Sequence, residues 1–211
     1  MIRGDYDSLR QAIRPGDIIA FGGEGFVSAL IKLATGRCPV SHVGIVFRTE
    51  VSGGMWQNRV LESTTLDGFS GVVSTRLSQR LRDYRGRVWW LPLSAEARAR
   101  GDWPRTEKWL LAQEGKPYAR REAALSALDL LERVPLIGKL FRNPDRHARL
   151  FCSQLAGGGL KEGGVLPPEI NPAELTPRDL VVMRLYAACV QLKGSGREIP
   201  GFNTLEPETF S

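Results

Sequence analysis

Two histidines and three cysteines set the limits of the chemistry that this 211-residue chain can carry out. The histidines are His42 and His147, and the cysteines are Cys38, Cys152 and Cys189. A zinc site built from these residue types needs several of them at close spacing, and the sequence contains no CxxC pair and no HExxH segment. Nucleophilic catalysis needs only a nucleophile, a base and a group that orients the base. The inventory favours a cysteine nucleophile and implies no metal or organic cofactor.

Cys152 and His42 are the pair best placed to react. Cys152 lies where an irregular stretch is predicted to turn into a helix over 151–160. Backbone N–H groups at a helix start favour a thiolate, and they can receive the oxyanion that forms when the thiolate attacks a carbonyl. His42 opens a predicted strand over 43–47, so its imidazole is expected at the end of the sheet. The competing interpretation is structural, because a lone cysteine is usually a small buried hydrophobe.

The other candidates are assigned structural roles. Cys38 lies beside Pro39 in a loop, and Cys189 lies inside an apolar segment. His147 belongs to a charged run over 145–149 that is expected on a solvated face. It stays in reserve as an alternative base.

Short strands dominate the first ninety-odd residues, and helices dominate the rest. Strands are predicted over 17–21, 43–47, 57–63, 72–73 and 87–91, after a short helix over 5–13. Because helices do not alternate with these strands, a largely antiparallel sheet is expected. Further helices are predicted over 26–36, from Ser94 onward, over 106–114, over 121–133 and around Cys152. The apolar segment 180–192 fits a strand or a helix.

Composition and charge exclude several classes of protein. The chain is 42% hydrophobic and 25% charged, which is enough to bury a core and argues against a disordered chain. The net charge of +6 is too small and scattered to indicate nucleic-acid binding. A group of arginines around the last predicted strand is expected to form a solvated face, so no nucleic-acid partner is expected; the group consists of Arg80, Arg82, Arg85 and Arg87.

The first residues are charged and contain no apolar run of the kind found in signal peptides. No stretch reaches the ~18 uncharged apolar residues that a transmembrane segment needs. A cytoplasmic location after synthesis is therefore expected, with export by another route left open.

Five short motifs, taken in order along the chain, resemble a known family. They are RPGDII at 14–19, SHVGIV at 41–46, VLES at 60–63, GKPY at 115–118 and FCSQL at 151–155. In this order they resemble the circularly permuted NlpC/P60 papain-like hydrolases, the YiiX-like group related to the lecithin:retinol acyltransferase family. The resemblance implies an α+β, papain-like fold with a small antiparallel sheet packed against helices. The resemblance covers roughly residues 14–186, and one domain is expected over 1–193. The Gly-, Pro- and Glu-bearing residues 194–211 are expected to form a loosely held tail.

Carried over residue by residue, the resemblance implies Cys152 as nucleophile, His42 as general base and Glu62 as the polar third member. Glu62 lies on the next predicted strand, and adjacent antiparallel strands can bring its carboxylate to the imidazole and fix the tautomer. A surface glutamate at a strand end is the competing interpretation, and Glu50 and Asp67 are less well placed. Tyr118 is implied to line the pocket, where it could hydrogen-bond the oxyanion or the substrate.

Two features depart from the family's pattern. Three consecutive glycines at 157–159 stand where a bulkier helix is usual, and each costs a helix roughly 1 kcal/mol relative to alanine. Arg120 and Arg121 follow the tyrosine where glycines or an acidic residue are common. The first departure questions the rigidity of the cysteine helix, and the second makes a relative's substrate an unsafe guide.

The implied function is a cysteine-dependent hydrolase of an amide or ester bond, of the type that cleaves cell-wall peptides. Two alternatives stay open: a lipid acyltransferase or thioesterase-like enzyme, and a module that binds a lipid or peptide without turnover. Under all three hypotheses, the molecule that the protein binds is a peptide or a lipid acyl group.

Iodoacetamide labelling separates an enzyme from a binding module, because only a thiolate reacts quickly with this reagent. At pH ~6 we expect Cys152 to be alkylated faster than Cys38 and Cys189, as followed by peptide mass spectrometry. Equal rates at the three cysteines would mean that no activated thiolate is present.

Overall fold

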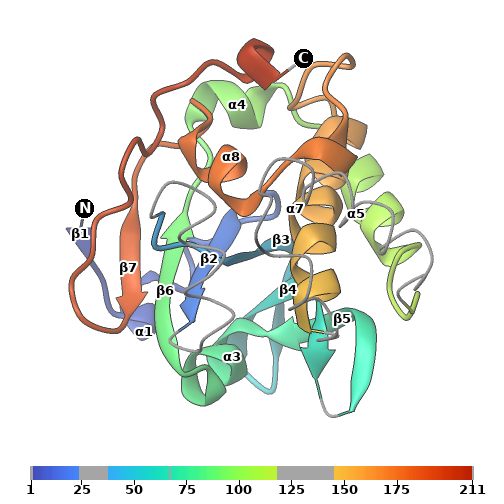
Figure 1. Ribbon diagram of the computed structural model, residues 1–211. Helices are drawn as coiled ribbons and strands as arrows, with labels where there is room; N and C mark the ends of the chain where they lie inside the picture. Colours follow the sequence, from blue (N-terminus) through green and yellow to red (C-terminus); the bar gives the residue numbers. More distant parts are fainter. Residues whose placement is uncertain (1, 24–37, 67, 118–144, 211) are drawn as a thin grey trace, which may run out of the picture.

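The structure is a computed structural model, and it describes residues 2–23, 38–66, 68–117 and 145–210 (Figure 1). These residues form a mixed α/β fold with one seven-stranded sheet and six α-helices. The strands are β1 (Ile2–Arg3), β2 (Ile18–Gly23), β3 (His42–Ser52), β4 (Met55–Leu66), β5 (Phe69–Arg76), β6 (Gly86–Leu91) and β7 (Val190–Lys193). The helices are α1 (Tyr6–Leu9), α3 (Leu77–Asp83), α4 (Ala95–Ala99), α5 (Trp103–Leu111), α7 (Asp145–Glu162) and α8 (Pro177–Val182), with 3-10 turns η1 (Pro172–Glu174) and η2 (Pro207–Phe210).

The sheet has the strand order β1-β7-β6-β2-β3-β4-β5. Every pairing is antiparallel except β1 with β7, which is parallel. The prediction of a largely antiparallel sheet is therefore confirmed. At the β3–β4 hairpin, Gly53 and Gly54 adopt φ of 60° and 73°, a left-handed conformation that favours glycine.

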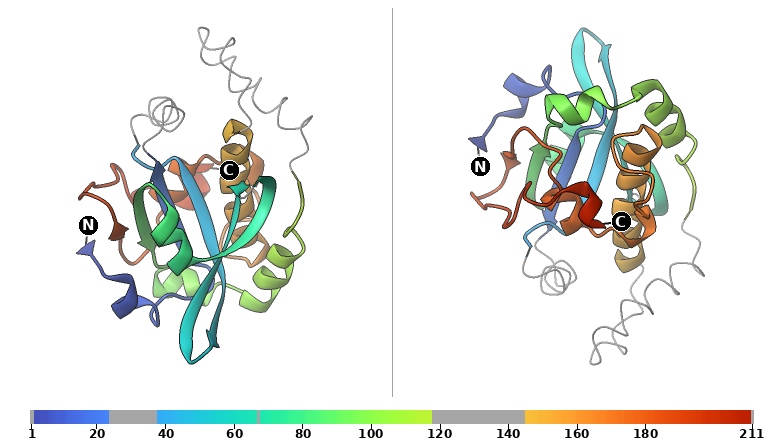
Figure 2. Two further views of the ribbon diagram at one scale, coloured as in Figure 1. Left: turned by 90° about the horizontal axis from the view of Figure 1, so that it is seen from below. Right: turned by 90° about the horizontal axis from the view of Figure 1, so that it is seen from above.

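Helices cover both faces of the sheet (Figure 2). On one face, Leu155 and Leu160 of α7 pack with Leu180 of α8 into the larger core cluster. On the other face, Tyr6 of α1 and Leu77 of α3 belong to a second cluster. The central strand β2 is buried at every position because its alternating side chains enter the two clusters in turn.

The five predicted strands are confirmed as β2 to β6, and most of their ends extend beyond the predicted ranges. The first helix begins as predicted, with Asp5 accepting from the backbone N–H of Ser8, but it is shorter because it ends at Leu9. Ser94 caps α4 as predicted, by accepting from the backbone N–H of Ala97. The predicted helices over 26–36 and 121–133 lie outside the described residues.

The sequence prediction missed one helix and left one segment undecided between helix and strand. The polar stretch between β5 and β6 forms a helix, α3, that was not predicted. The segment 180–192 contains both alternatives, since α8 ends at Val182 and β7 begins at Val190.

The triple glycine brings α7 close to its neighbours on three sides. A Cβ atom at Gly157 would lie 2.7 Å from Leu175, and one at Gly158 would lie 2.6 Å from the Trp109 ring. At Gly159 a Cβ would meet the Leu110 side chain at 2.9 Å. Each of these distances is shorter than van der Waals contact. The glycines therefore let the helix pack tightly, and α7 continues through them to Glu162.

Residues 194–210 make defined contacts with the body of the protein. Asn203, with φ of 59°, accepts from the backbone N–H groups of Leu185 and Tyr186 through one side-chain oxygen. The indole of Trp89 donates to the carbonyl of Arg197, and Ile199 is buried in the larger core. The proposed division into a domain over 1–193 and a separate tail stays a prediction.

Replacement of Gly159 by alanine tests the packing of α7. Helix propensity alone would stabilise the protein by about 1 kcal/mol. Because the new methyl group would crowd Leu110, which is fully buried, we expect the opposite, a loss of about 1–2 kcal/mol in the free energy of unfolding. Urea denaturation measures this change.

Leu110→Ala provides the matched control for this crowding. The double variant Gly159→Ala/Leu110→Ala is expected to lose less stability than the sum of the two single losses, because the shortened side chain makes room. A stabilising Gly159→Ala would contradict the packing described here.

Candidate active site

His42 stands at the first residue of β3, at the end of that strand that meets Phe21 of β2. Its ring lies 5.3 Å from the Phe21 ring, between centroids, and only 6% of the residue is exposed. Nε2 lies 2.9 Å from Oε2 of Glu62 on the neighbouring strand β4, where Glu62 pairs with Gly44. The antiparallel register thus brings the two predicted residues together, whereas Glu50 lies further along β3 and pairs with Gln57.

Glu62 is fully buried and accepts hydrogen bonds at both carboxylate oxygens. Oε1 accepts from the Thr75 hydroxyl of β5 at 3.0 Å and from Nε of Arg80 at 2.7 Å. Oε2 accepts from Nη2 of Arg80 at 2.9 Å in addition to the contact with His42. A carboxylate has about four lone-pair positions, so this one is fully used. The carboxylate therefore has no freedom to turn away from His42.

Arg80 joins this cluster, although sequence reasoning placed it elsewhere. It was expected on a solvated face, but the residue is only 8% exposed. Its Nε and Nη2 atoms each donate a hydrogen bond to the Glu62 carboxylate. The guanidinium lies 5.3 Å from the centroids of the Phe21 and Tyr84 rings, at a distance typical of cation–π contact. The sequence contained one signal for this burial. Leu77 lies three positions before Arg80, so both residues fall on the same face of α3, and they are its two buried residues.

Cys152 lies on α7, which packs against β3 and β4, the two strands that carry His42 and Glu62 (Figure 1). The residue is 1% exposed, and its side chain is a hydrogen-bond partner of the His42 imidazole. Because Nε2 of His42 faces Glu62, Nδ1 is the nitrogen left for the cysteine sulfur. The next residue, Ser153, anchors the helix by donating its hydroxyl to the backbone carbonyl of Leu175.

The predicted helix start at Cys152 is wrong. Helix α7 begins by Asp145, so Cys152 lies about two turns inside it. Backbone N–H groups in a helix interior bond to the carbonyls four residues earlier and are not available to an oxyanion. The stabilisation of a thiolate by helix-terminal N–H groups therefore does not apply here, and the imidazole is the group that acts on the sulfur.

Charge at the site shifts the pKa values of His42 and Glu62 in opposite directions. Burial by itself lowers the pKa of His42, but negative charge and hydrogen bonding at Cys152 and Glu62 outweigh it and raise the pKa to about 9. Burial by itself raises the pKa of Glu62, but the hydrogen bond from His42 and the charge of Arg80 lower it to about 2. At neutral pH the imidazole is protonated and the carboxylate is ionised.

The remaining candidates are separate from this cluster or lie outside the described part of the chain. Tyr118 lies outside the described residues, and His147 falls in a part of α7 whose side chains are not described. Cys38 and Cys189 are buried in the larger core, and burial raises the pKa of the Cys189 thiol to about 11. Cys189 is thus a poor nucleophile at neutral pH.

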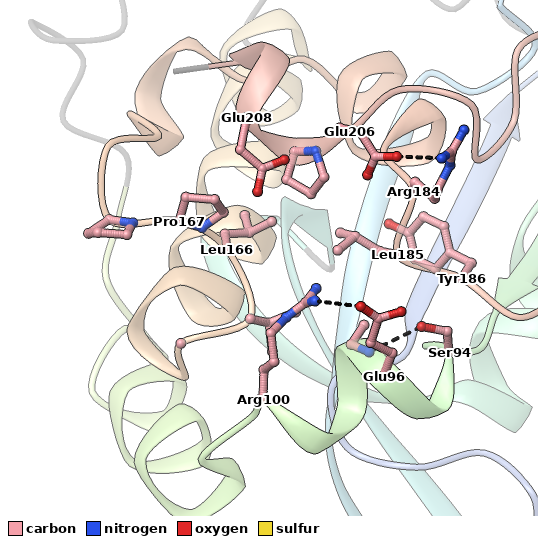
Figure 3. Close-up of a pocket in the computed structure, with 15 residues that line it drawn as sticks. Ser94, Glu96, Arg100, Leu166, Pro167, Arg184, Leu185, Tyr186, Glu206 and Glu208 are labelled. Carbon is pink, nitrogen blue, oxygen red and sulfur yellow. Dashed lines mark hydrogen bonds and ion pairs between the residues drawn. The ribbon is translucent and has the colours of Figure 1, made fainter.

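A pocket of about 660 Å³ lies beyond the C-terminal end of α7 (Figure 3). It is lined by α4, by the loop that begins at Gly164 and by the segments around Leu185 and Glu208. Cys152 and Glu162, the last residue of α7, are ten residues apart, which corresponds to about 15 Å along the helix axis, and Gly164 lies two residues further along the chain. Its charged side chains form ion pairs at the rim, such as Arg184 with Glu206. This pocket is distinct from the Cys152–His42–Glu62 cluster.

Within residues 2–23, 38–66, 68–117 and 145–210, His, Cys, Asp and Glu side chains nowhere gather in a group of three or more that could hold a metal ion. Among the helices in this part of the chain, none has the length and apolar character needed to cross a membrane. Comparison with known proteins adds no assignment, because no family model and no curated protein matches this sequence.

The two pKa shifts predict how stability depends on pH. The pKa of His42 is raised from 6.5 to about 9, so its contribution is full below pH 6.5 and is lost as the pH rises through 9. The pKa of Glu62 is lowered from 4.5 to about 2, so its contribution is present above pH 4.5 and is lost as the pH falls through 2. We expect each loss to be on the order of 3 kcal/mol in the free energy of unfolding.

Urea denaturation of the wild type and of His42→Gln measures the alkaline change. The wild type should lose stability between pH 6.5 and 9, while the variant should show a flat profile there. Comparison of the wild type with Glu62→Gln measures the acid change in the same way. The pKa of the buried Asp17 is raised, so Asp17 favours the folded state as the pH falls, which opposes the loss at Glu62. A wild-type profile that matches His42→Gln would contradict the protonated, buried imidazole.

Proposed function

We propose that this protein is a cysteine hydrolase that cleaves an amide or ester bond with Cys152, His42 and Glu62. The observation that carries the proposal is the position of the His42 imidazole, which is buried between a carboxylate 2.9 Å from Nε2 and the side chain of Cys152. Such a nucleophile, base and orienting group are the parts that covalent catalysis requires. The isolated-hydrophobe interpretation of Cys152 does not account for its partnership with a charged imidazole.

In the proposed reaction, the Cys152 thiolate attacks the substrate carbonyl carbon and forms a carbon–sulfur bond. The His42 imidazolium then gives its proton to the leaving amine or alcohol as the carbonyl carbon's bond to that group breaks. A thioester remains on Cys152, and the neutral imidazole removes a proton from an incoming water molecule. Attack by this water releases the carboxylic acid and restores the thiolate and imidazolium. Glu62 holds the imidazole in place throughout.

The order of the elements supports a permuted papain-like fold for this proposal. The histidine strand β3 precedes the cysteine helix α7 in the chain, as in the YiiX-like group that the five motifs resemble. The resemblance adds Tyr118 as a group that would contact the oxyanion or substrate. It also makes cell-wall peptides the first substrate class to test and lipid acyl groups the second.

Replacement of Cys152 by serine tests the proposal directly. Wild-type protein and the variant are incubated with cell-wall peptide fragments and, separately, with phospholipids, and products are followed by mass spectrometry. Cys152→Ser should reduce turnover at least about a thousandfold, because the nucleophile acts as a unit with its base. The wild type, quenched in acid, should carry an acyl group on Cys152.

Cys189→Ser is the matched control, because it removes a buried thiol that is not part of the site. Its turnover should stay close to that of the wild type. Turnover that survives Cys152→Ser would overturn the assignment of the nucleophile. Ligand binding with no turnover on either substrate class, together with a slowly alkylated Cys152, would favour the binding module.

A further inference from the structure

Glu62 is held by a charged partner as well as by the imidazole it orients. Nε and Nη2 of Arg80 donate to the two carboxylate oxygens at 2.7 and 2.9 Å. The Arg80 side chain is 10% exposed and the Glu62 side chain is fully buried. Because burying two charges costs free energy that their attraction only partly returns, such a pair is often no more stable than apolar residues of similar volume. Its position behind His42 therefore suggests a role in the chemistry.

The charges at the site balance only when Arg80 is counted. In the reactive state, the Cys152 sulfur and the Glu62 carboxylate are both negative, and the His42 imidazolium supplies a single positive charge. These three groups alone would leave one uncompensated negative charge in a buried place, which is strongly disfavoured. The guanidinium is always protonated, so it supplies the missing positive charge.

We propose that Arg80 is a positioning residue that allows the Cys152 thiolate and the Glu62 carboxylate to exist together on either side of His42. The proposal rests on the proposed function, because it takes Cys152 as the nucleophile. Without Arg80 the site would bind one more proton at a given pH. That proton would go to the sulfur, because a carboxyl group is intrinsically a stronger acid than a thiol.

The surroundings of Arg80 fit this role. Asp83 and Tyr84 are the other titratable groups that act on its guanidinium, both from its own stretch of chain, and Glu62 acts on it from the sheet. The rings of Phe21 and Tyr84 flank the guanidinium and meet each other edge to face, with centroids 5.0 Å apart. A planar guanidinium suits both the two-oxygen contact and the aromatic contacts, whereas an ammonium group cannot make the planar two-oxygen contact.

The test is the rate of Cys152 alkylation by iodoacetamide as a function of pH, followed by peptide mass spectrometry in wild type, Arg80→Met and Arg80→Lys. Arg80→Met should move the rise of the rate to higher pH and lower the rate at pH ~6 about tenfold or more. Arg80→Lys keeps the charge, so its profile should lie close to that of the wild type. Turnover of Arg80→Lys should nevertheless fall through kcat, because the carboxylate is no longer held at two points.

Two control variants show whether a change in the alkylation rate of Cys152 arises from a lost charge, from a lost hydrogen bond or from general destabilisation. Thr75→Val removes a neutral donor from the same carboxylate and should change the rate at pH ~6 by less than about threefold. Arg98→Met breaks another ion pair, with the buried Asp17, away from the site. It should lower stability and leave the alkylation profile unchanged.

A double variant keeps the proposal testable if Arg80→Met folds poorly. Glu62→Gln/Arg80→Met removes both charges of the pair, so it leaves no unpaired buried carboxylate and should fold better than Arg80→Met alone. Because the thiolate and imidazolium then balance each other, its alkylation rate at pH ~6 should recover at least about threefold relative to Arg80→Met.

The outcomes distinguish this proposal from the proposed function. If wild-type Cys152 reacts rapidly and Arg80→Met reacts equally rapidly at pH ~6, the role of Arg80 is wrong and the cysteine hydrolase stands. A shift of the same size in Arg98→Met, or a double variant no more reactive than Arg80→Met, would also overturn it. If wild-type Cys152 shows no enhanced reactivity, the proposed function itself fails.

Discussion

A fully buried carboxylate is the constraint on which the rest of the site depends. Glu62 has no exposed surface, so every lone pair that its charge presents must be satisfied by the protein. Three neighbouring elements supply the donors: His42 opens β3, Thr75 lies in β5 and Arg80 projects from α3. The same bonds that satisfy the carboxylate also fix the imidazole, so the stability of the sheet and the geometry of the site have a common origin.

Close packing of α7 is the second requirement, because it brings Cys152 to the sheet. Small residues on this helix let Leu110, Leu175 and the Trp109 ring approach the helix backbone. The helix itself packs against β3 and β4 on the face of the sheet opposite α3, so Cys152 approaches the imidazole from that face. A sequence feature that weakens an isolated helix serves here to bring α5 and Leu175 closer to α7, because tertiary packing outweighs intrinsic propensity.

Sequence periodicity was a good guide wherever strands are buried and regular. β2 and β3 are rich in Val and Ile, their side chains alternate between two cores, and their places in the chain were predictable from that pattern. Helix α3 was missed because it is short and polar, and only Leu77 and Leu81 mark its apolar face. The start of α7 was placed too late because the residues before Cys152 are charged, and a charged stretch was interpreted as irregular.

The sequence by itself determined which chemistry was available: with two histidines and three cysteines, a base and a nucleophile could be chosen from a very short list. It also indicated that Glu62 could meet His42, because neighbouring antiparallel strands present residues of matching register on one face. Only the tertiary structure decided that Arg80 joins them, and that Cys152 lies within a helix. Residue type and spacing encode local periodicity, but the pairing of buried charges is set by elements that meet in space from distant parts of the chain.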